Sequence, residues 1–240
     1  MGNDIELLRE GASTLGLTLT LDQLEQFKEY MNYTLEVNKT MNLTAITEDR
    51  EFIIKHFLDS LTLSQVYNFE NTERVLDMGT GAGFPGIPLK ILYSEAKFVL
   101  VDSLNKRIQF LKNVVEKLNL KNIHCIHGRA EQLGQEMDYR ETFNVVVSRA
   151  VAPLAILSEY CIPFLKTDGV FLCLKGPKYK EEIQRSMGAI KKLGGKLEEV
   201  KSIKLPFSDI THYILIIRKI NKTPTRYPRK PGKPTKSPIK

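Results

Sequence analysis

A glycine-rich stretch that directly follows a short apolar run constrains the fold of this chain more than any other feature. Residues 75–86 read VLDMGTGAGFPG, so an acid stands where a strand would end and glycines then alternate with small residues. The apolar run 87–92 that follows predicts the start of a helix. A strand, a glycine turn and a helix N-terminus leave backbone groups open to a ligand, so we expect a ligand site at this turn.

Short apolar runs alternate with helix-length stretches from residue 74 onward. The runs are 75–78, 98–101, 123–126, 143–147 and 170–174, and the helices are expected at 87–93, 105–118, 153–165 and 180–193. Apolar strands separated by helices indicate an α/β fold, a mostly parallel sheet with helices on both faces. The last two runs, 197–205 and 210–219, have no helix-length gap between them. They predict a hairpin that gives the sheet an antiparallel edge.

The sequence divides into three regions. Residues 1–70 predict an N-terminal helical cap, with a capping box at Thr20–Gln23, a polar loop at 38–44 and a second amphipathic helix at 51–63. Residues 71–220 hold the α/β pattern. Residues 221–240 contain five prolines, seven Lys or Arg and no acid, which predicts an extended basic tail with no apolar residues to bury.

Composition indicates a globular cytoplasmic protein. Hydrophobic residues make up 42% of the chain, which is enough for a proper core, and neither a signal region nor a membrane-length apolar run is present. The three cysteines lack a C-x-x-C spacing and are expected to be reduced core residues. His124, Cys125 and His127 have mixed spacing on a strand, so we expect no metal site.

The glycine loop matches more than one kind of cofactor site. Gly81, Gly83 and Gly86 satisfy the dinucleotide fingerprint, and Asp102 follows at the spacing of a ribose-binding acid, as in a nicotinamide dehydrogenase. Asp77, however, adds a negative charge that a diphosphate would not favour. A cationic ligand suits the loop better, and S-adenosylmethionine is such a ligand.

Polar residues at the ends of the later strands agree with this cofactor. Asp102 follows 98–101 and can accept hydrogen bonds from two ribose hydroxyls. Ala130 and Glu131 follow the third strand, where they could reach the adenine edge, and Arg149 follows the fourth, facing the methyl group. Each of them alone could equally be a surface or capping residue, but their order along the chain favours one cofactor site.

Several motifs in the chain are similar to those of one family. NLTAI at 42–46, HFLDS at 56–60, DMGTGAGFPGIPL, VDSLNKRIQFL, VVVSRAVAPL and LKG resemble the RsmG (GidB) family over residues 15–220. The resemblance implies a class I methyltransferase fold, a Rossmann-like sheet of seven strands with an N-terminal helical cap. It also implies an S-adenosylmethionine-dependent enzyme that methylates N7 of one guanine, guanine 527, in 16S rRNA of the small ribosomal subunit. The loop and the resemblance together predict these cofactor residues: Asp77, Gly79, Gly81, Gly83, Phe84, Asp102, Ser103, Leu104, Ala130, Glu131 and Arg149.

The expected chemistry needs alignment more than proton transfer. The N7 lone pair of guanine attacks the methyl group directly, so no general base is required. Arg149 and Lys175 are the candidate catalytic residues, with a sheet-edge salt bridge and a solvated loop lysine as their alternatives. His56 and Asp59 lie one helical turn apart and either face the cleft or cap the helix and contact the other domain.

The basic tail predicts contact with RNA phosphates. The candidate RNA-binding residues are Lys222, Arg226, Arg229, Lys230 and Lys233. A solubilising tail is the alternative. The expected partner is 16S rRNA within the small ribosomal subunit, and we expect the protein to be a monomer. An RNA-binding assembly factor that keeps the fold without catalysis remains a further alternative.

Overall fold

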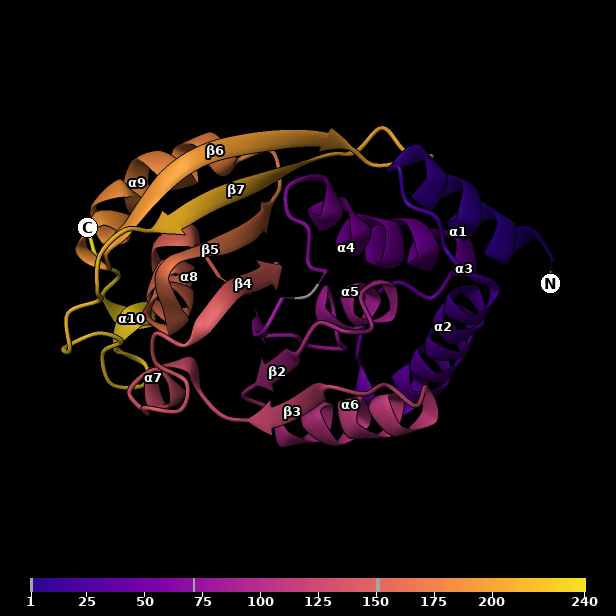
Figure 1. Cartoon of the computed structure of the whole chain (residues 1–240), viewed down its shortest axis with the longest axis horizontal. Coiled ribbons are helices and arrows are strands. Elements are labelled where there is room, and N and C mark those ends of the chain that lie inside the picture. The colour runs from indigo at the N-terminus through magenta and orange to yellow at the C-terminus, as the bar shows by residue number, and fades with distance from the viewer. Residues whose placement is uncertain (1, 71, 150–151) are drawn as a thin grey trace.

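A seven-stranded sheet forms the centre of the part of the chain described by this computed structural model, residues 2–70, 72–149 and 152–240 (Figure 1). Its strands are β1 (Val75–Met78), β2 (Phe98–Asp102), β3 (Ile123–His127), β4 (Phe143–Arg149), β5 (Leu165–Lys175), β6 (Gly195–Lys204) and β7 (Thr211–Lys219). They are arranged in the order β3-β2-β1-β4-β5-β7-β6. The strands β1 to β5 run parallel to one another, which confirms the predicted fold class.

The hairpin is confirmed at the edge of the sheet, and the structure shows which of its two strands is outermost. β7 pairs antiparallel with both β5 and β6, so it lies inside the sheet and β6 forms the edge. The burial of the two strands explains this order. Residues 214–217 of β7 are buried, whereas β6 exposes charged residues along its length. A charged strand suits an edge because it discourages pairing with other chains.

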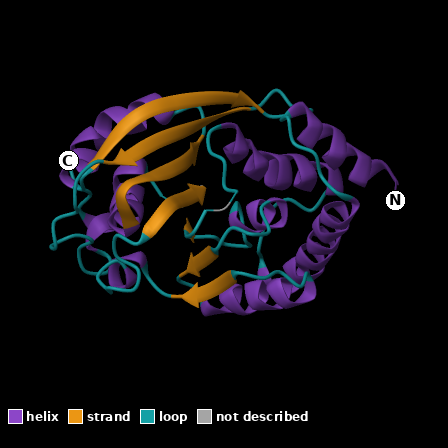
Figure 2. Ribbon diagram, in the orientation of Figure 1, coloured by secondary structure: helices purple, strands orange, loops and turns teal. Residues whose placement is uncertain are grey.

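Helices cover both faces of the sheet (Figure 2). α5 (Gly86–Leu92), α6 (Asn105–Lys117) and the N-terminal helices pack on one face, and α8 (Leu154–Cys161) and α9 (Tyr179–Lys192) on the other. Successive strand residues alternate between the two cores, as Val75 and Leu76 do in β1. The continuous apolar runs of the sequence therefore reflect burial on both faces.

The N-terminal helices are α1 (Gly2–Thr14), α2 (Leu21–Met41) and a helical stretch from α3 (Asp49–Phe52) through a π-helical turn (Ile53–Leu58) to α4 (Asp59–Leu61). The capping box is confirmed, since the Thr20 hydroxyl accepts from the Gln23 amide and the Gln23 side chain accepts from the Thr20 amide. The predicted loop begins later than expected. α2 continues to Met41 because Asn38 remains helical and its side chain accepts from the amides of Leu43 and Thr44.

The C-terminal segment, residues 221–240, is not the extended tail that the sequence predicted. Tyr227, Pro234 and Ile239 are buried, and Lys233–Lys236 form the short helix α10. The segment lies beside α7 (Ala130–Leu133) and α8, at the end of the molecule opposite α1 and α2 (Figure 1). The prediction was wrong because a few buried apolar residues are enough to fold the segment when side chains of the domain also bind its backbone.

In the part of the chain that the structure describes, every helix is too short or too polar to span a membrane.

Candidate functional site

A cavity of about 560 Å³ opens at the carboxyl ends of β1, β2 and β4. The order of the strands reverses between β1 and β4, which is where open α/β sheets bind ligands. Many of the predicted cofactor residues line the cavity: Gly79, Gly81, Phe84, Asp102, Ser103, Leu104, Ala130, Glu131 and Arg149. The fold thus brings together residues that are spread over seventy positions of the sequence.

Asp77 and Gly83 belong to the loop but do not line the cavity. The buried Asp77 carboxyl lies under the turn, where Oδ2 accepts from the Thr80 hydroxyl at 2.6 Å and the Gly86 amide at 2.8 Å. Burial raises the pKa of Asp77 to about 7, in spite of these two donors. The acid that the sequence predicted as a ligand contact therefore shapes the loop from beneath.

Gly83 allows α2 to approach the loop. It has φ of 105°, and a Cβ atom there would lie 2.6 Å from the Tyr30 hydroxyl. Tyr30 is fully buried and donates to the Ala82 carbonyl at 2.5 Å. The helical cap is thereby bonded to the cofactor loop, a connection that no sequence pattern indicated.

Asp102 links the glycine loop to the loop after β2. Its Oδ1 accepts from the Leu104 amide at 2.9 Å, and its Oδ2 accepts from the Gly81 amide at 3.0 Å. Arg107 Nη1 also lies 3.4 Å from Oδ2. A carboxylate has about four acceptor sites, so Oδ1, with one donor, retains capacity for a ligand hydroxyl. The geometry fits the expected ribose-binding role.

Arg149, at the end of β4, lies on the rim of the cavity. Its Nη1 donates to Asp59 Oδ2 at 2.8 Å and to the Lys55 carbonyl at 2.9 Å, and its guanidinium lies 5.0 Å from the centre of the Phe84 ring. The salt bridge considered as an alternative is therefore present, but it holds Arg149 at the cavity. Its Nη2 also donates to Nδ1 of His56 at 3.1 Å. Three of the five guanidinium N–H groups therefore have partners among the described residues, and two N–H groups are left for a ligand.

His56 also lines the cavity, and its ring stacks on Phe84 at 4.4 Å between centroids. Burial and then the charge of Arg149 lower the pKa of His56 to about 3, so the imidazole is neutral. Arg149 can only donate, so His56 Nδ1 accepts from it and Nε2 donates to the Thr44 hydroxyl. With both ring nitrogens bonded, His56 is a poor candidate for a general base.

Asp59 is buried and connects three elements. Besides Arg149 it contacts Nδ1 of His212, which lies near the start of β7. Burial alone would raise the pKa of Asp59, but the hydrogen bond from His212 and the charge of Arg149 lower it. The same hydrogen bond raises the pKa of His212. Asp59 therefore contacts the other part of the chain, as one of the two sequence-based interpretations expected, and His212 is a partner that the sequence did not indicate.

Lys175 does not line the cavity. Its side chain is buried and donates to the Ala152 carbonyl at 2.8 Å, and its ammonium pairs with Glu182 at 2.8 Å. Ala150 and Val151, part of the motif after β4, lie outside the described residues. Lys175 thus holds the chain just beyond them. These bonds do not match a solvated loop lysine, and they place Lys175 outside the cavity where a catalytic residue was expected.

The predicted RNA-binding residues fall into two groups. Lys222, Arg226, Lys230 and Lys233 are exposed. Arg229 instead pairs with the buried carboxylate of Glu159, with Nη2 2.6 Å from Oε2. The positive charge of Arg229 is therefore largely neutralised by Glu159 within the protein.

Further residues line the cavity that the sequence did not single out for the cofactor. They include Leu43, Thr44, Arg107 and Tyr160. Leu43, Thr44 and Arg107 stand in the motifs that carry the family resemblance, without an assigned role, whereas no local pattern marks Tyr160.

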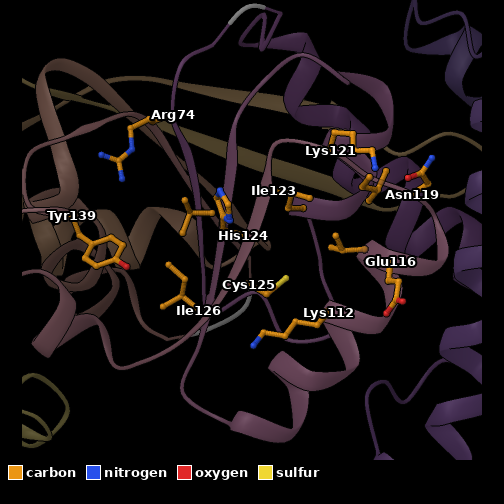
Figure 3. Close-up of a pocket in the computed structure, with 13 residues that line it drawn as sticks. Arg74, Lys112, Glu116, Asn119, Lys121, Ile123, His124, Cys125, Ile126 and Tyr139 are labelled. Carbon is orange, nitrogen blue, oxygen red and sulfur yellow. The ribbon is translucent and has the colours of Figure 1, made fainter.

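A second, larger hollow of about 710 Å³ lies at the edge strand β3. Figure 3 shows its lining, with side chains on both sides of β3, among them Arg74, Lys112, His124 and Tyr139. It lacks the converging strand ends and the glycine loop of the first cavity. We therefore take the cavity at the β1–β4 switch as the functional site.

Comparisons with known proteins agree with this choice. Residues 23–211 match the family model GidB, described as rRNA small subunit methyltransferase G. Proteins named ribosomal RNA small subunit methyltransferase G are 53% identical in Alkaliphilus metalliredigens and 48% identical in Acetivibrio thermocellus; the match covers 98% of this chain and 98% and 96% of those proteins.

Solved structures of lower identity share the fold. One of them is M. jannaschii TYW2 in complex with AdoMet, with a TM-score of 0.52, 19% identity and coverage of 68% of this chain and 75% of that chain. The Methanococcus jannaschii fibrillarin pre-rRNA processing protein has a TM-score of 0.52, 16% identity and coverage of 65% and 70%. With the cavity at the strand-order switch and near full-length matches to its curated relatives, this chain belongs to the rRNA small subunit methyltransferase G (GidB) family.

Proposed function

We propose that the protein transfers the methyl group of S-adenosylmethionine to N7 of a guanine in 16S rRNA, guanine 527 by the resemblance of its motifs. The observation that carries the proposal is the convergence of the glycine loop, Asp102, Glu131 and Arg149 on one cavity. Family membership decides against the nicotinamide dehydrogenase that the glycine fingerprint also allowed.

The lining residues fit the parts of this cofactor. The loop backbone at Gly79 and Gly81 suits the amino acid end, Asp102 the ribose hydroxyls, and Glu131 the adenine amine. S-adenosylmethionine supplies an electrophilic methyl group on a sulfonium. Arg149 keeps two N–H donors for the guanine or the cofactor, and O6 of guanine is an acceptor next to N7.

N7 as the target fits the acid–base state of the site. The lone pair of N7 forms the new bond without losing a proton, so the enzyme needs to align its substrates rather than supply a base. His56, whose two nitrogens are bonded, and the arginine both lack that capacity in this arrangement. The site is thus built for orientation.

A cytosine C5 reaction would need a cysteine thiolate. Cys161 and Cys173 are fully buried, and burial raises the pKa of Cys173 to about 12 and that of Cys161 well above its ordinary value. Burial also raises the pKa of Cys125 to about 11, and none of the three cysteines lines the cavity. This argues against covalent attack on the base.

The test is methyl transfer with labelled cofactor to small subunits that lack the modification, followed by digestion to nucleosides. We expect the label in 7-methylguanosine. Label in another methylated nucleoside would contradict the choice of atom, and no label would favour the assembly factor without catalysis.

A further inference from the structure

The C-terminal segment, residues 221–240, is bound to the same side of the molecule as the adenine end of the proposed cofactor site. Its firmest attachment is Arg229, whose guanidinium donates to both oxygens of Glu159 and whose amide donates to Oε1 at 2.8 Å. The Glu159 side chain is 1% exposed. A bidentate pair on a buried carboxylate is a strong, geometrically specific contact.

A second attachment precedes it. The Arg140 guanidinium donates to the carbonyls of Thr223 and Tyr227, both at 2.7 Å, and Gln135 donates to the Pro228 carbonyl at 2.8 Å. Tyr227 and Ile239 are buried in the core on that face of the sheet. The course of the segment is therefore fixed by side chains of the methyltransferase fold.

These attachments bring Gly232 to a residue of the cofactor cavity. The Gly232 amide donates to Glu131 Oε1 at 3.1 Å. The Tyr160 hydroxyl, from the residue next to Glu159, lies 3.4 Å from the same oxygen. Glu131 is 7% exposed and lines the cavity, so this nearly buried carboxylate depends on the C-terminal segment for its closest hydrogen bond.

We propose that the C-terminal segment is a working part of the cofactor site, in which the Gly232 amide positions Glu131 for recognition of the adenine amine. Both contacts fall on Oε1, and Oε2 has no hydrogen-bond partner among the described residues. Oε2 is therefore the oxygen that accepts from an exocyclic amine. A carboxylate held in place before binding loses less conformational entropy when the ligand arrives.

This inference rests on the proposed function, because it takes S-adenosylmethionine as the ligand. It gives the segment a role distinct from RNA contact. Removing its end should weaken cofactor binding in the isolated protein, with no RNA present.

The test compares wild type with a chain that ends after Lys230. This truncation keeps Arg229 and the carbonyls bound by Arg140 but removes Gly232. The matched control is Lys236→Ala, which removes an exposed charge of the same segment and keeps the Gly232 amide. Calorimetry gives the Kd of each protein for S-adenosylhomocysteine and for S-inosylhomocysteine, in which the adenine amine is replaced by an oxygen.

We expect the truncation to raise the Kd for S-adenosylhomocysteine about tenfold, in line with the loss of a charge-assisted hydrogen bond, and the control to change it less than about twofold. Discrimination against the inosine analogue should fall in the truncated chain. The proposal would be overturned if the truncated chain folds cooperatively and its Kd values are unchanged. It would also be overturned if both Kd values rise by the same factor. If wild type itself does not bind S-adenosylhomocysteine, the proposed function fails instead.

A second measurement needs no variant and so survives a truncation that does not fold. Hydrogen exchange at the Gly232 amide of wild type should be slow and should slow further, at least severalfold, on adding S-adenosylhomocysteine. Exchange at the rate of an unprotected amide, with or without the ligand, would show that Gly232 does not hold Glu131.

Discussion

Asp59 and Arg149 are 90 positions apart in the chain, yet Asp59 Oδ2 lies 2.8 Å from Arg149 Nη1 at the rim of the cofactor cavity. The Asp59 side chain is 2% exposed and that of Arg149 is 16% exposed. The pair joins the N-terminal helical cap to the end of β4, so the orientation of Arg149 depends on the cap.

Asp59→Ala should destabilise the protein by about 3 kcal/mol, because it leaves Arg149 and His212 without their buried partner. Methyl transfer should fall at least about tenfold in kcat/KM, since the guanidinium loses its orientation. Chemical denaturation and initial rates measure the two effects. The control is Glu51→Gln, which removes an exposed ion pair with Lys55 and should cost less than about 0.5 kcal/mol. Equal effects of the two substitutions would contradict the role of Asp59.

Gly83→Ala should cost roughly 2–4 kcal/mol, because a Cβ at φ of 105° would lie 2.6 Å from the Tyr30 hydroxyl and 2.7 Å from Ile87. The control is Gly16→Ala, which introduces backbone strain without a clash of the added Cβ with other atoms. Gly16 has φ of 71° with no atom within 4 Å of the added Cβ, so only about 1 kcal/mol of backbone strain is expected. Similar losses in the two variants would mean that α2 does not press on the cofactor loop.

Asp77 should make the stability of the protein fall as the pH rises. Burial raises its pKa to about 7, from about 4 in the unfolded chain. The unfolded state therefore ionises first, and the contribution of Asp77 is full below pH ~4 and lost as the pH rises through about 7. Asp77→Asn, which cannot ionise, should lose less free energy of unfolding between pH 4 and pH 8 than wild type. Denaturation curves at both pH values measure the difference, and identical pH slopes would refute it.

The exposed cations of the C-terminal segment should contribute to RNA binding through phosphate contacts. Replacing Lys222, Arg226, Lys230 and Lys233 with Ala should lower the slope of log K against log salt by about 3, at roughly 0.7–0.9 per contact. Substitution is a better test than deletion, because the segment is packed on the domain. The control is Arg9→Ala on α1, the helix that lies at the other end of the molecule (Figure 1). An unchanged slope in the fourfold variant would leave the segment with no part in RNA binding.

The sequence predicted the sheet and the position of the cofactor loop because both depend on local patterns. Apolar runs of strand length, such as that of β1, and glycines that follow an acid can be recognised within a dozen residues. The strand order also brought Asp102, Glu131 and Arg149 together as expected. The direction in which a side chain points could not be predicted from such patterns. Asp77 was therefore expected in the cavity, although its carboxyl lies beneath the loop.

Contacts between distant segments account for what the sequence did not predict. His212 lies 153 positions from Asp59, and Arg229 lies 70 positions from Glu159. Neither pair leaves a local pattern, since each residue alone resembles an ordinary surface charge. The second pair is one of the contacts that hold the C-terminal segment on the domain, and composition alone, which shows none of them, predicted an extended tail.

The most direct test of the proposed reaction is chemical mapping of the methylated position. Unmethylated small subunits are incubated with S-adenosylmethionine and wild type or Arg149→Ala protein, and the 16S rRNA is then reduced and treated with aniline, which cleaves at 7-methylguanosine. We expect one cofactor-dependent cut, at guanine 527, that is strong with wild type and lost or greatly weakened with Arg149→Ala. Methyl incorporation by wild type without any cut would contradict it.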